Sequence, residues 1–562
     1  MFKINVFLAF FILISSLGFA QPATMQLKER GEVCLKMKHA EFQLIKDQIR
    51  LDISSVSTDS VEFYVDKNRY ELVVKTMIPF RVLPLETLLV NEAKFDVQYL
   101  LSSDFSFYPT YEQYDSVMTI LANMYPQFMQ RQDLGTLPSG RKIIIWKMSK
   151  NISQDEPEPH ILLTSTMHGN ETTGAILMFK LAKYLIDNYG TDSLSTLLLD
   201  SNTIWINPFA NPDGTYNGGN HTVAQAKRYN ANNVDINRNF PDPDDGPHPD
   251  GNAYQPETVI FMDFANNYQF TLAANFHGGA EVFNYPWDTW SKLTADDDWW
   301  QKIGNQYATN CHNAANNSYF TFLGGVTNGY QWYEVTGGRQ DYMNFWHNCR
   351  EVTIELSNTK LLPENQFSTL WNYNKQALLD FLCATNQGLR GYVTDSVTGL
   401  PLKAKIELLN HDKDSSHVYT YMPHGNYYRM LDSGFYQVKY SASGYNAKVV
   451  DSVWVDSDAK TWLNIALSPK ISGLENGIGL IDGFTVFPNP ATDFVIIKPK
   501  TLVEKLQIQI YDASGKLVDT KWADRGGFYT IDVKNLESGV YMLKIFSACS
   551  SLEGAAKLLI ER

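Results

Sequence analysis

Hydrophobic residues follow a different spacing in the middle of the chain than at its two ends. Between residues 107 and 386, short apolar runs alternate with segments whose apolar residues recur every three or four positions. The run 161–165 predicts a buried strand, and the spacing within 174–189 predicts an amphipathic helix after it. This alternation predicts an α/β domain whose mixed, largely parallel sheet is flanked by helices. Further strands are expected at 203–206, 270–276 and 351–356.

The segments on either side have simpler patterns. Residues 21–106 contain alternating stretches at 61–65 and 70–74, which predict strands of a small α/β domain. This domain could be a prosegment, and a plain structural domain is the alternative. After residue 386, turns rich in Gly, Asp, Ser and Pro separate short apolar runs, which predicts all-β structure. We expect two small β-sandwich domains with a linker between them: 387–470, 471–483 and 484–562.

The start of the chain predicts a secretory signal peptide over residues 1–20. Lys3 supplies a positive charge, residues 6–19 form a nearly unbroken apolar run, and small residues stand at Gly18 and Ala20, as a cleavage site requires. No later segment is apolar enough to span a bilayer. We therefore expect a secreted or cell-surface protein without a stable transmembrane anchor.

Composition narrows the range of partners. The formal net charge is −14, which argues against nucleic acid and anionic membranes as binding partners. The five cysteines are too few for a disulfide framework. A Cys311–Cys349 bridge and free buried thiols both remain open, because pairing cannot be derived from a sequence.

Zinc-ligand residue types follow two of the expected strands. The run His168-Gly169-Asn170-Glu171 comes after strand 161–165, and His277 ends strand 270–276. A catalytic zinc takes three protein ligands and keeps a fourth position for water. The His-x-x-Glu spacing alone is a weak signal, and a single histidine after a strand is commonly structural. Together, the three residues predict a zinc site.

Two further groups fit hydrolysis at a chain end. Glu355 lies within the apolar strand 351–356, where a carboxylate is costly unless it is paired or functional. We interpret it as a general base for zinc-bound water; a salt-bridged structural glutamate is the alternative. Asn237 and Arg238 place an amide beside a planar guanidinium, a combination suited to binding a carboxylate.

Taken in order along the chain, these motifs resemble the zinc metallocarboxypeptidases, in particular the branch related to carboxypeptidases D, N, E and M. The resemblance covers roughly residues 108–385. It implies one zinc ion bound by His168, Glu171 and His277, with Glu355 as general base. It also implies that Arg228 polarises the scissile carbonyl. Asn237 and Arg238 would bind the terminal carboxylate of the substrate, and Tyr333 would close over the substrate.

The resemblance extends to specificity. Asp288 stands eleven positions after His277, where the basic-specific members carry an aspartate, and Gln340 also matches that branch. A buried carboxylate there implies a preference for C-terminal Lys or Arg, whereas a loop aspartate that caps the following turn is the alternative. Arg339 departs from the methionine common in this branch, and its charge near the pocket weakens the inference.

Both C-terminal segments also resemble known domains. Residues 387–470 are similar to the transthyretin-like domain that follows the catalytic domain in this branch. Residues 484–562 resemble the sorting domain of the type IX secretion route, on the basis of Pro488-Asn489-Pro490, the Gly515 turn and Gly539-Val540-Tyr541. This resemblance implies export through the periplasm and contact with secretion machinery.

The sequence therefore predicts a secreted zinc-dependent exopeptidase that hydrolyses the C-terminal peptide bond and releases Lys or Arg. Its partners would be peptide or protein C-termini. Two alternatives stay open: a zinc amidase acting on cell-wall peptides, and a non-catalytic surface binding protein on the same fold.

Overall fold

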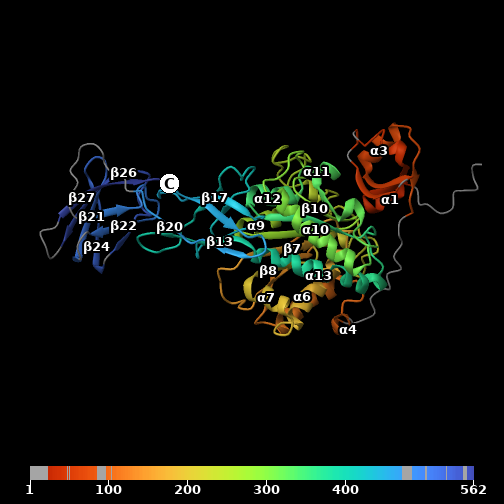
Figure 1. Cartoon of the computed structure of the whole chain (residues 1–562), viewed down its shortest axis with the longest axis horizontal. Helices are drawn as coiled ribbons and strands as arrows, with labels where there is room; N and C mark the ends of the chain where they lie inside the picture. The colour runs from red at the N-terminus through yellow and green to blue at the C-terminus, as the bar shows by residue number, and fades with distance from the viewer. Residues whose placement is uncertain are drawn as a thin grey trace, which may run out of the picture.

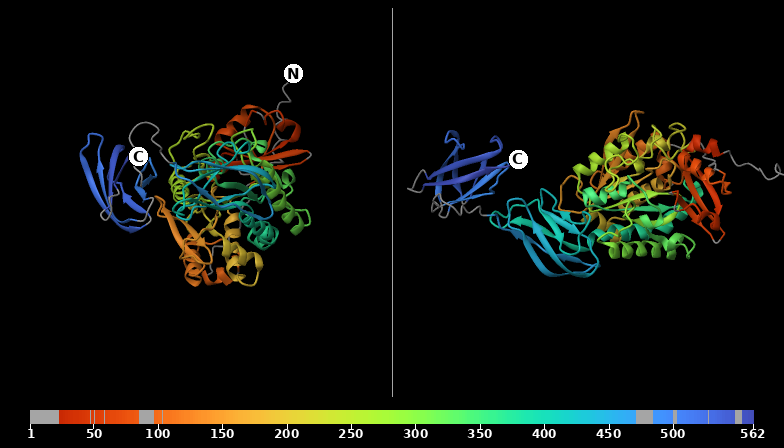
Figure 2. Two further views of the ribbon diagram at one scale, coloured as in Figure 1. Left: turned by 60° about the vertical axis from the view of Figure 1, so that its left-hand side comes forward. Right: turned by 90° about the horizontal axis from the view of Figure 1, so that it is seen from above.

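The computed structural model describes residues 23–46, 48–49, 51–57, 59–84, 97–102, 104–470, 484–499, 503–526, 528–547 and 553–562. The expected signal peptide (1–20) and linker (471–483) lie outside these residues. The described elements form four groups that succeed one another along the long axis of the molecule (Figures 1 and 2), with the N-terminal group beside the large central domain.

The N-terminal unit, residues 23–84, is built on a four-stranded antiparallel sheet in the order β2-β3-β1-β4. Stretch 61–65 forms a strand as predicted, but the strand expected at 70–74 is wrong, because these residues belong to helix α3. Asp66 caps this helix by accepting the backbone N–H of Arg69 at 2.8 Å, and a local cap favours a helix. The elements are α1 (Ala23–Arg30), β1 (Glu32–Lys38), α2 (His39–Phe42), β2 (Asp52–Val56), β3 (Ser60–Asp66), α3 (Lys67–Lys75) and β4 (Arg81–Val82); α4 (Val97–Ser102) follows.

An eight-stranded sheet, in the order β11-β10-β12-β9-β7-β8-β6-β5, forms the centre of the largest domain. Its pairs β8–β7, β7–β9 and β9–β12 are parallel, as are β10 and β11, whereas the remaining pairs are antiparallel. The predicted mixed, largely parallel sheet is confirmed. Its strands are β5 (Met129–Thr136), β6 (Lys142–Met148), β7 (His160–Ser165), β8 (Thr203–Asn207), β9 (Leu272–His277), β10 (Glu281–Tyr285), β11 (Val326–Asn328) and β12 (Arg350–Leu356).

Helices cover both faces of this sheet. One apolar core joins it to α5, α6, α7, α10 and α13, and a second core joins its other face to α9 and α12. Alternate residues of one strand serve the two cores: Ile161 and Leu163 of β7 enter the first and Leu162 the second, as the twofold period of a strand requires. The helices are α5 (Tyr111–Met124), α6 (Thr173–Asp187), α7 (Ser193–Ser201), α8 (Pro212–Thr215), α9 (Pro256–Asn267), α10 (Asp297–Ala314), α11 (Gly329–Trp332), α12 (Arg339–His347) and α13 (Phe367–Cys383).

The next group is a β-sandwich of two sheets, in the orders β16-β13-β19, with β20 also beside β13, and β15-β14-β17-β18. It is fastened to the central domain by a buried cluster around Asp296. This carboxylate accepts hydrogen bonds from Arg350 at 2.7 Å and from Arg429 at 2.7 and 2.9 Å. The strands are β13 (Gly388–Asp395), β14 (Lys405–Leu408), β15 (Val418–Tyr419), β16 (Asn426–Arg429), β17 (Gly434–Ser441), β18 (Lys448–Val455), β19 (Lys460–Trp462) and β20 (Ile465–Leu467).

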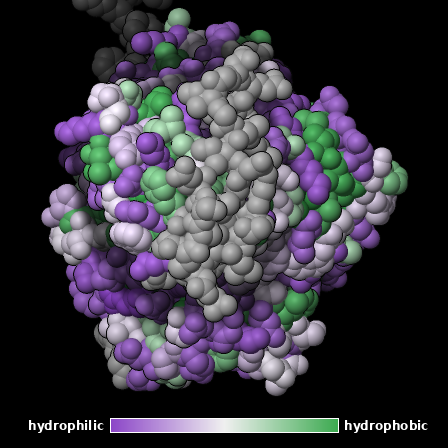
Figure 3. Space-filling model, turned by 90° about the vertical axis from the view of Figure 1, so that its left-hand side faces the viewer, coloured by the Kyte–Doolittle hydropathy of each residue, from purple (hydrophilic) through white to green (hydrophobic). Residues whose placement is uncertain are grey.

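The C-terminal module also has two sheets, β21-β22-β25 and β24-β23-β26-β27, around an apolar core of its own. On the face of the molecule shown in Figure 3, hydrophobic residues stand in small groups among hydrophilic ones. Among the described residues, no helix combines the length and apolar composition needed to cross a bilayer. The strands are β21 (Phe484–Phe487), β22 (Phe494–Pro499), β23 (Val503–Tyr511), β24 (Leu517–Gly526), β25 (Tyr529–Asp532), β26 (Gly539–Ser547) and β27 (Glu553–Ile560).

The cysteine question is settled for the described residues. Cys311 and Cys349 are both buried free thiols, and Cys383 is a free thiol that is only partly buried. Of the two possibilities left open by the sequence, free thiols therefore describe Cys311 and Cys349, whereas Cys549 lies outside the described residues.

Candidate active site

Three potential metal ligands meet at the carboxyl ends of neighbouring parallel strands. His168 and Glu171 lie in the loop after β7, and His277 ends β9. Glu171 Oε2 is 3.0 Å from His168 Nδ1 and 2.8 Å from His277 Nδ1, and the two Nδ1 atoms are 3.2 Å apart. All three residues are at most 3% exposed. The His168 loop needs Gly169, because a Cβ there would lie 2.3 Å from the backbone of Gly214.

The donor set fits a zinc ion. Tetrahedral zinc with bonds of about 2.0–2.2 Å places its ligand atoms roughly 3.3–3.6 Å apart, so these donors need to separate by only a few tenths of an ångström. His168 Nε2 lies 3.1 Å from a carboxylate oxygen of Asp235, which leaves Nδ1 to face the metal. Asn275 lies 2.7 Å from Nε2 of His277. Burial lowers the pKa of His277 to about 4, so this ring is neutral, as a metal ligand must be.

Cations surround the other side of Glu171. Lys360 Nζ is 3.0 Å and Arg228 Nη1 is 3.7 Å from Glu171 Oε1. Burial opposes ionisation of Glu171, but His168 and Lys360 hold its pKa well below the usual value. The candidate metal site therefore contains an ionised carboxylate at neutral pH.

Glu355 stands next to this cluster on β12. The parallel pairing of β12 with β9 sets Glu355 opposite His277, and Glu355 is 7% exposed. The same cavity is lined by the three potential ligands and by several of the expected substrate-binding residues: Asn237, Asp288 and Tyr333. The strand register thus places the carboxylate of Glu355 beside the three potential metal ligands, in the cavity that a substrate would enter.

The expected carboxylate-binding pair is divided between two cavities. Asn237 lines the cavity of the metal cluster, whereas Arg238 lines an adjacent one on the side of the N-terminal unit. Asp235 organises this region, because it accepts Arg228 Nε at 2.9 Å and the backbone N–H of Asn237 at 3.0 Å. One carboxylate therefore orients His168, Arg228 and Asn237 together.

Asp288 is buried at the end of the cavity, 4% exposed. Its Oδ1 accepts Asn284 Nδ2 at 3.1 Å and Gln340 Nε2 at 3.0 Å, and the oxygen of the Gln340 amide accepts the Thr353 backbone N–H at 2.6 Å. Asp341 holds the Asp288 loop by accepting its backbone N–H at 3.0 Å. Burial raises the pKa of Asp288 to about 7, with Asn284 acting in the opposite direction. The capping role considered for Asp288 falls instead to Asp341, which accepts the N–H of Thr289 at 2.8 Å.

Arg339, the cation that weakened the specificity inference, is already paired. Its Nε donates to Glu351 Oε1 at 2.9 Å, and both side chains are at most 1% exposed. Its backbone N–H donates to Asn237 Oδ1 at 3.0 Å. The charge of Arg339 is therefore offset by Glu351 rather than directed at Asp288.

Sequence reasoning gave no role to Asp235, Lys360 or Asn275. Asp235 lies in the same polar run as Asn237 and Arg238, so its place there was the available signal. Asn275 is two residues before His277, on the same face of β9. Lys360 had no comparable signal, because its contact with Glu171 depends on the path of the chain after β12.

Comparisons with known proteins agree with this geometry. Residues 114–377 match the model of the zinc carboxypeptidase family, and residues 485–561 match the secretion system C-terminal sorting domain. The chain is 33% identical over 409 residues to the human carboxypeptidase N catalytic chain, covering 64% of this chain and 86% of that protein. It is 34% identical over 409 residues to human carboxypeptidase D, covering 69% of this chain but only 29% of that longer protein.

Among solved structures, the chain is similar to the crystal structure of thrombin activatable fibrinolysis inhibitor. The TM-score is 0.49 at 18% identity, covering 63% of this chain and 98% of the other.

Proposed function

The chain belongs to the zinc carboxypeptidase family, and from this premise we propose that it is an exported zinc exopeptidase that hydrolyses C-terminal peptide bonds. The observation that carries the proposal is the convergence of His168, Glu171 and His277 at 2.8–3.2 Å with Glu355 on the adjoining strand. Three ligands plus a carboxylate beside the open coordination position are the parts that metal-assisted hydrolysis requires.

Each residue has a role in this chemistry. Bound zinc would polarise the scissile carbonyl and lower the pKa of a water molecule. Glu355 takes the proton of that water and passes it to the leaving amine. Arg228, held by Asp235 at 2.9 Å, donates to the oxyanion that develops on the carbonyl oxygen.

Recognition of a chain end is assigned to Asn237 and Arg238, which bind the terminal carboxylate, and to Tyr333, which closes over the substrate as a hydrogen-bond donor. Arg238 lines the adjacent cavity. To bind the carboxylate of a substrate beside the metal ligands, its side chain has to extend from that cavity into theirs. A guanidinium suits this task because its planar donors match a carboxylate in two places.

Preference for C-terminal Lys or Arg is assigned to Asp288, positioned by Gln340 at 3.0 Å. A cationic side chain entering this buried pocket would replace lost solvation with a charge-assisted hydrogen bond. The pairing of Arg339 with Glu351 supports this assignment, because the charge of Arg339 is then offset by Glu351.

Export is the remaining part of the proposal. The sorting-domain match at residues 485–561 indicates secretion, with the machinery of that route as partner. Residues 1–20 would serve as signal peptide, and the sandwich that follows the catalytic domain would be its transthyretin-like domain.

The test compares purified zinc-loaded protein with its Glu355→Gln variant on peptides ending in Arg, Lys, Leu or Glu, and on the same peptides with an amidated end. We expect one zinc per chain, loss of activity with a chelator, and a loss of at least about 100-fold in the variant with zinc retained. Glu112→Gln, an exposed change on α5, is the control and should remain active.

The alternatives give different results. Equal turnover of free and amidated peptides would favour a zinc amidase acting on cell-wall peptides. Absence of turnover by a zinc-loaded chain would favour a non-catalytic surface binding protein.

A further inference from the structure

Asp288, the residue to which basic specificity is assigned, is held by three elements of the catalytic domain. Its own loop, residues 286–296, joins β10 to α10. Helix α12 provides Gln340, which donates to the Asp288 carboxylate, and Asp341, which accepts two backbone N–H groups of the loop. Strand β12 fixes Gln340 in turn, through the backbone N–H of Thr353. The position of the carboxylate therefore depends on how the loop, α12 and β12 lie relative to one another.

The far end of each of these elements contacts one turn of the β-sandwich, residues 410–416, which we call the back turn. The contacts start from the end of the loop, from the residue after α12 and from the first residue of β12: Asp296 Oδ1 with His411 Nε2 at 3.0 Å, Asn348 Nδ2 with the Ser415 backbone oxygen at 2.7 Å, and Arg350 Nη2 with the Ser416 backbone oxygen at 2.5 Å. A fourth contact joins the middle of the loop to the same turn, since Lys292 Nζ lies 2.6 Å from Asp414 Oδ1. The back turn thus holds all three elements that hold Asp288.

The back turn is itself firmly built. Asp412 accepts hydrogen bonds from the Leu408 backbone N–H at 2.8 Å, from the Ser416 hydroxyl at 3.0 Å and from Arg429 at 2.6 Å. Arg429 is 1% exposed and also donates twice to Asp296. Hydrogen bonds between ionised groups are about twice as strong as neutral ones. The turn is therefore a fixed support rather than a loosely held loop.

The distance from the back turn to the pocket is short enough for a displacement to matter. Eight positions separate Gln340 from Asn348, about 12 Å along a helix, and three separate Thr353 from Arg350, about 10 Å along a strand. The hydrogen bond of 3.0 Å from Gln340 to Asp288 is lost when its atoms move apart by about 0.6 Å. A tilt of α12 by about 3° produces such a movement over this length.

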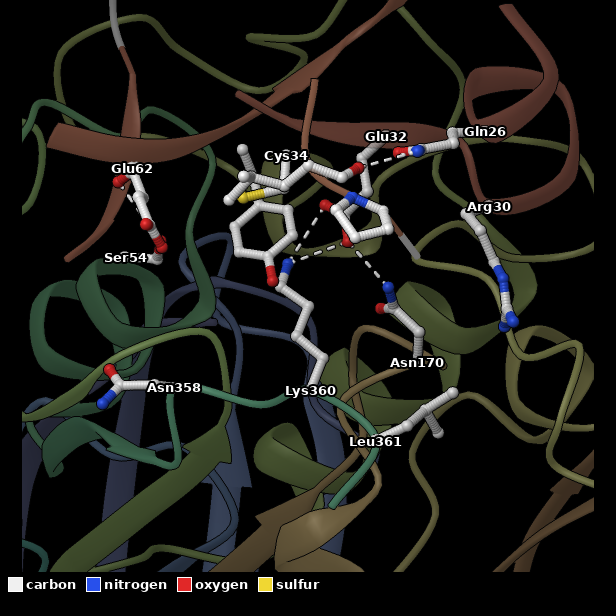
Figure 4. A pocket seen from close by; sticks show the side chains of 13 residues that line it. Gln26, Arg30, Glu32, Cys34, Ser54, Glu62, Asn170, Asn358, Lys360 and Leu361 are labelled. Carbon is white, nitrogen blue, oxygen red and sulfur yellow. Dashed lines mark hydrogen bonds and ion pairs between the residues drawn. The ribbon is translucent and has the colours of Figure 1, made fainter. Parts of the chain in front are cut away.

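The catalytic domain has a second seam, with the N-terminal unit, whose cavity is lined by other elements. There Glu32 accepts Lys360 Nζ at 2.9 Å beside a cavity of about 160 Å³ (Figure 4). Loop 286–296 and α12, both described throughout, contribute none of the residues that line this cavity. Glu62 lines it and pairs with Lys36 at 2.6 Å. A change at Glu62 therefore disturbs a domain seam without touching the supports of Asp288.

On the basis of the proposed function, we propose that the β-sandwich is a positioning element of the specificity pocket, and that its back turn fixes the Asp288 carboxylate where a cationic side chain binds. The back turn, which the structure describes in full, contributes no residue to the lining of the metal cavity. Its residues are therefore positioning residues. Loosening the turn should reduce discrimination between cationic and apolar C-terminal residues and leave the metal ligands in place.

The first measurement uses two variants of the full zinc-loaded chain that each remove one contact with the back turn. His411→Phe keeps the ring that packs on Tyr436 but loses the hydrogen bond to Asp296. Asn348→Gly loses the bond to Ser415, and glycine accepts the positive φ of this position. Each variant should lower the ratio of kcat/KM for peptides ending in Arg over Leu about three- to fivefold, the size of one hydrogen bond.

Two further readouts separate positioning from general damage. The loss on Arg peptides should appear in KM more than in kcat, because binding of the side chain is weakened, and zinc content and cleavage of Leu peptides should stay at the wild-type level. Glu62→Gln, at the other seam, should leave the ratio unchanged.

A double-mutant comparison tests whether the effect passes through Asp288. In an Asp288→Asn background, His411→Phe and Asn348→Gly should have no further effect on the Arg-to-Leu ratio, because the charge whose position they alter is gone. An unchanged ratio in both variants of the wild-type background would overturn the proposal. A fall of the same size in the Asp288→Asn background would also overturn it.

Binding of the same two peptides to chains that also carry Glu355→Gln separates this inference from the proposed function. An Arg-over-Leu preference in affinity that falls in His411→Phe would sustain the positioning role even if no chain cleaved either peptide. Cleavage with the same Arg preference in wild type and in both variants would keep the proposed function and reject the positioning role.

Discussion

Replacing Asp288 by Asn would remove one charge from the pocket and little else. The amide oxygen of Asn can keep the hydrogen bonds from Asn284 and Gln340. In the wild type, burial raises the pKa of Asp288 from 3.8 to about 7. A raised pKa of this kind means that the charged form costs on the order of several kcal/mol in the empty pocket.

A Lys or Arg side chain would offset that cost, whereas an apolar side chain would not. Removing one partner of a buried charge pair costs about 2–5 kcal/mol, or roughly 30- to 5,000-fold. We therefore expect Asp288→Asn to reduce kcat/KM for peptides ending in Arg by a factor in this range. Peptides ending in Leu should be cleaved equally well or better.

The pH dependence provides a second, independent readout. Only ionised Asp288 attracts a cation, so wild-type kcat/KM on Arg peptides should fall about tenfold per unit below pH 7 through this group, and Asp288→Asn should lack that dependence. The free energy of unfolding depends on the ionisation of Asp288 in the opposite direction to that expected for a salt-bridged aspartate. The folded pKa lies above the unfolded value, so the penalty grows as pH rises from about 4 to about 7.

Thermal unfolding of both proteins at pH 5 and pH 8 measures this term. The increase in melting temperature of Asp288→Asn over wild type should be larger at pH 8 than at pH 5. An unchanged Arg-to-Leu preference in the variant would refute the pocket assignment, and a gain that is the same at both pH values would refute the raised pKa.

Three other outcomes are expected. Amidated peptides should resist cleavage, and Arg238→Lys should lower kcat/KM on free peptides at least about tenfold because an ammonium group cannot grip a carboxylate in two places; equal cleavage of free and amidated ends would contradict this. Asp235→Asn should weaken zinc binding about 10- to 100-fold in a chelator competition, whereas Asp244→Asn at an exposed loop position should not. Mass spectrometry of secreted protein should find residues 484–562 removed from mature copies; their presence on every copy would argue against a sorting role.

Local pattern was sufficient for the elements that build the central sheet. Strand β7 and helix α6 follow directly from an apolar run and a helical period. The failure at 70–74 has a local cause, since Leu72 and Val74 are 45% and 47% exposed and only Val73 is buried within that stretch. The apolar residues that alternate there do not form the buried face of a sheet. The Asp66 cap favours a helix, and a helix is what these residues form.

The candidate site was predictable where function needs rare residue types on adjacent strand ends, as with His168 and His277. It was not predictable where a contact depends on distant parts of the chain. Glu32 and Lys360 are separated by 328 positions, and only the docking of the N-terminal unit brings them together. The pairing of Arg339 with Glu351 likewise requires α12 to pack beside β12, so the direction of the Arg339 charge could not be derived beforehand.

The Asp296 cluster has a consequence for how the chain can be divided. Asp296 belongs to the catalytic domain, but two of the side chains that bind it, Arg429 and His411, belong to the sandwich. The sequence indicates a domain boundary near residue 387. A protein cut there would expose the Asp296 carboxylate and lose Arg429, which donates two hydrogen bonds to it. Swapping the sandwich for that of a relative would require the donor to supply a matching arginine. Recombination, natural or engineered, should therefore exchange the two domains as a pair.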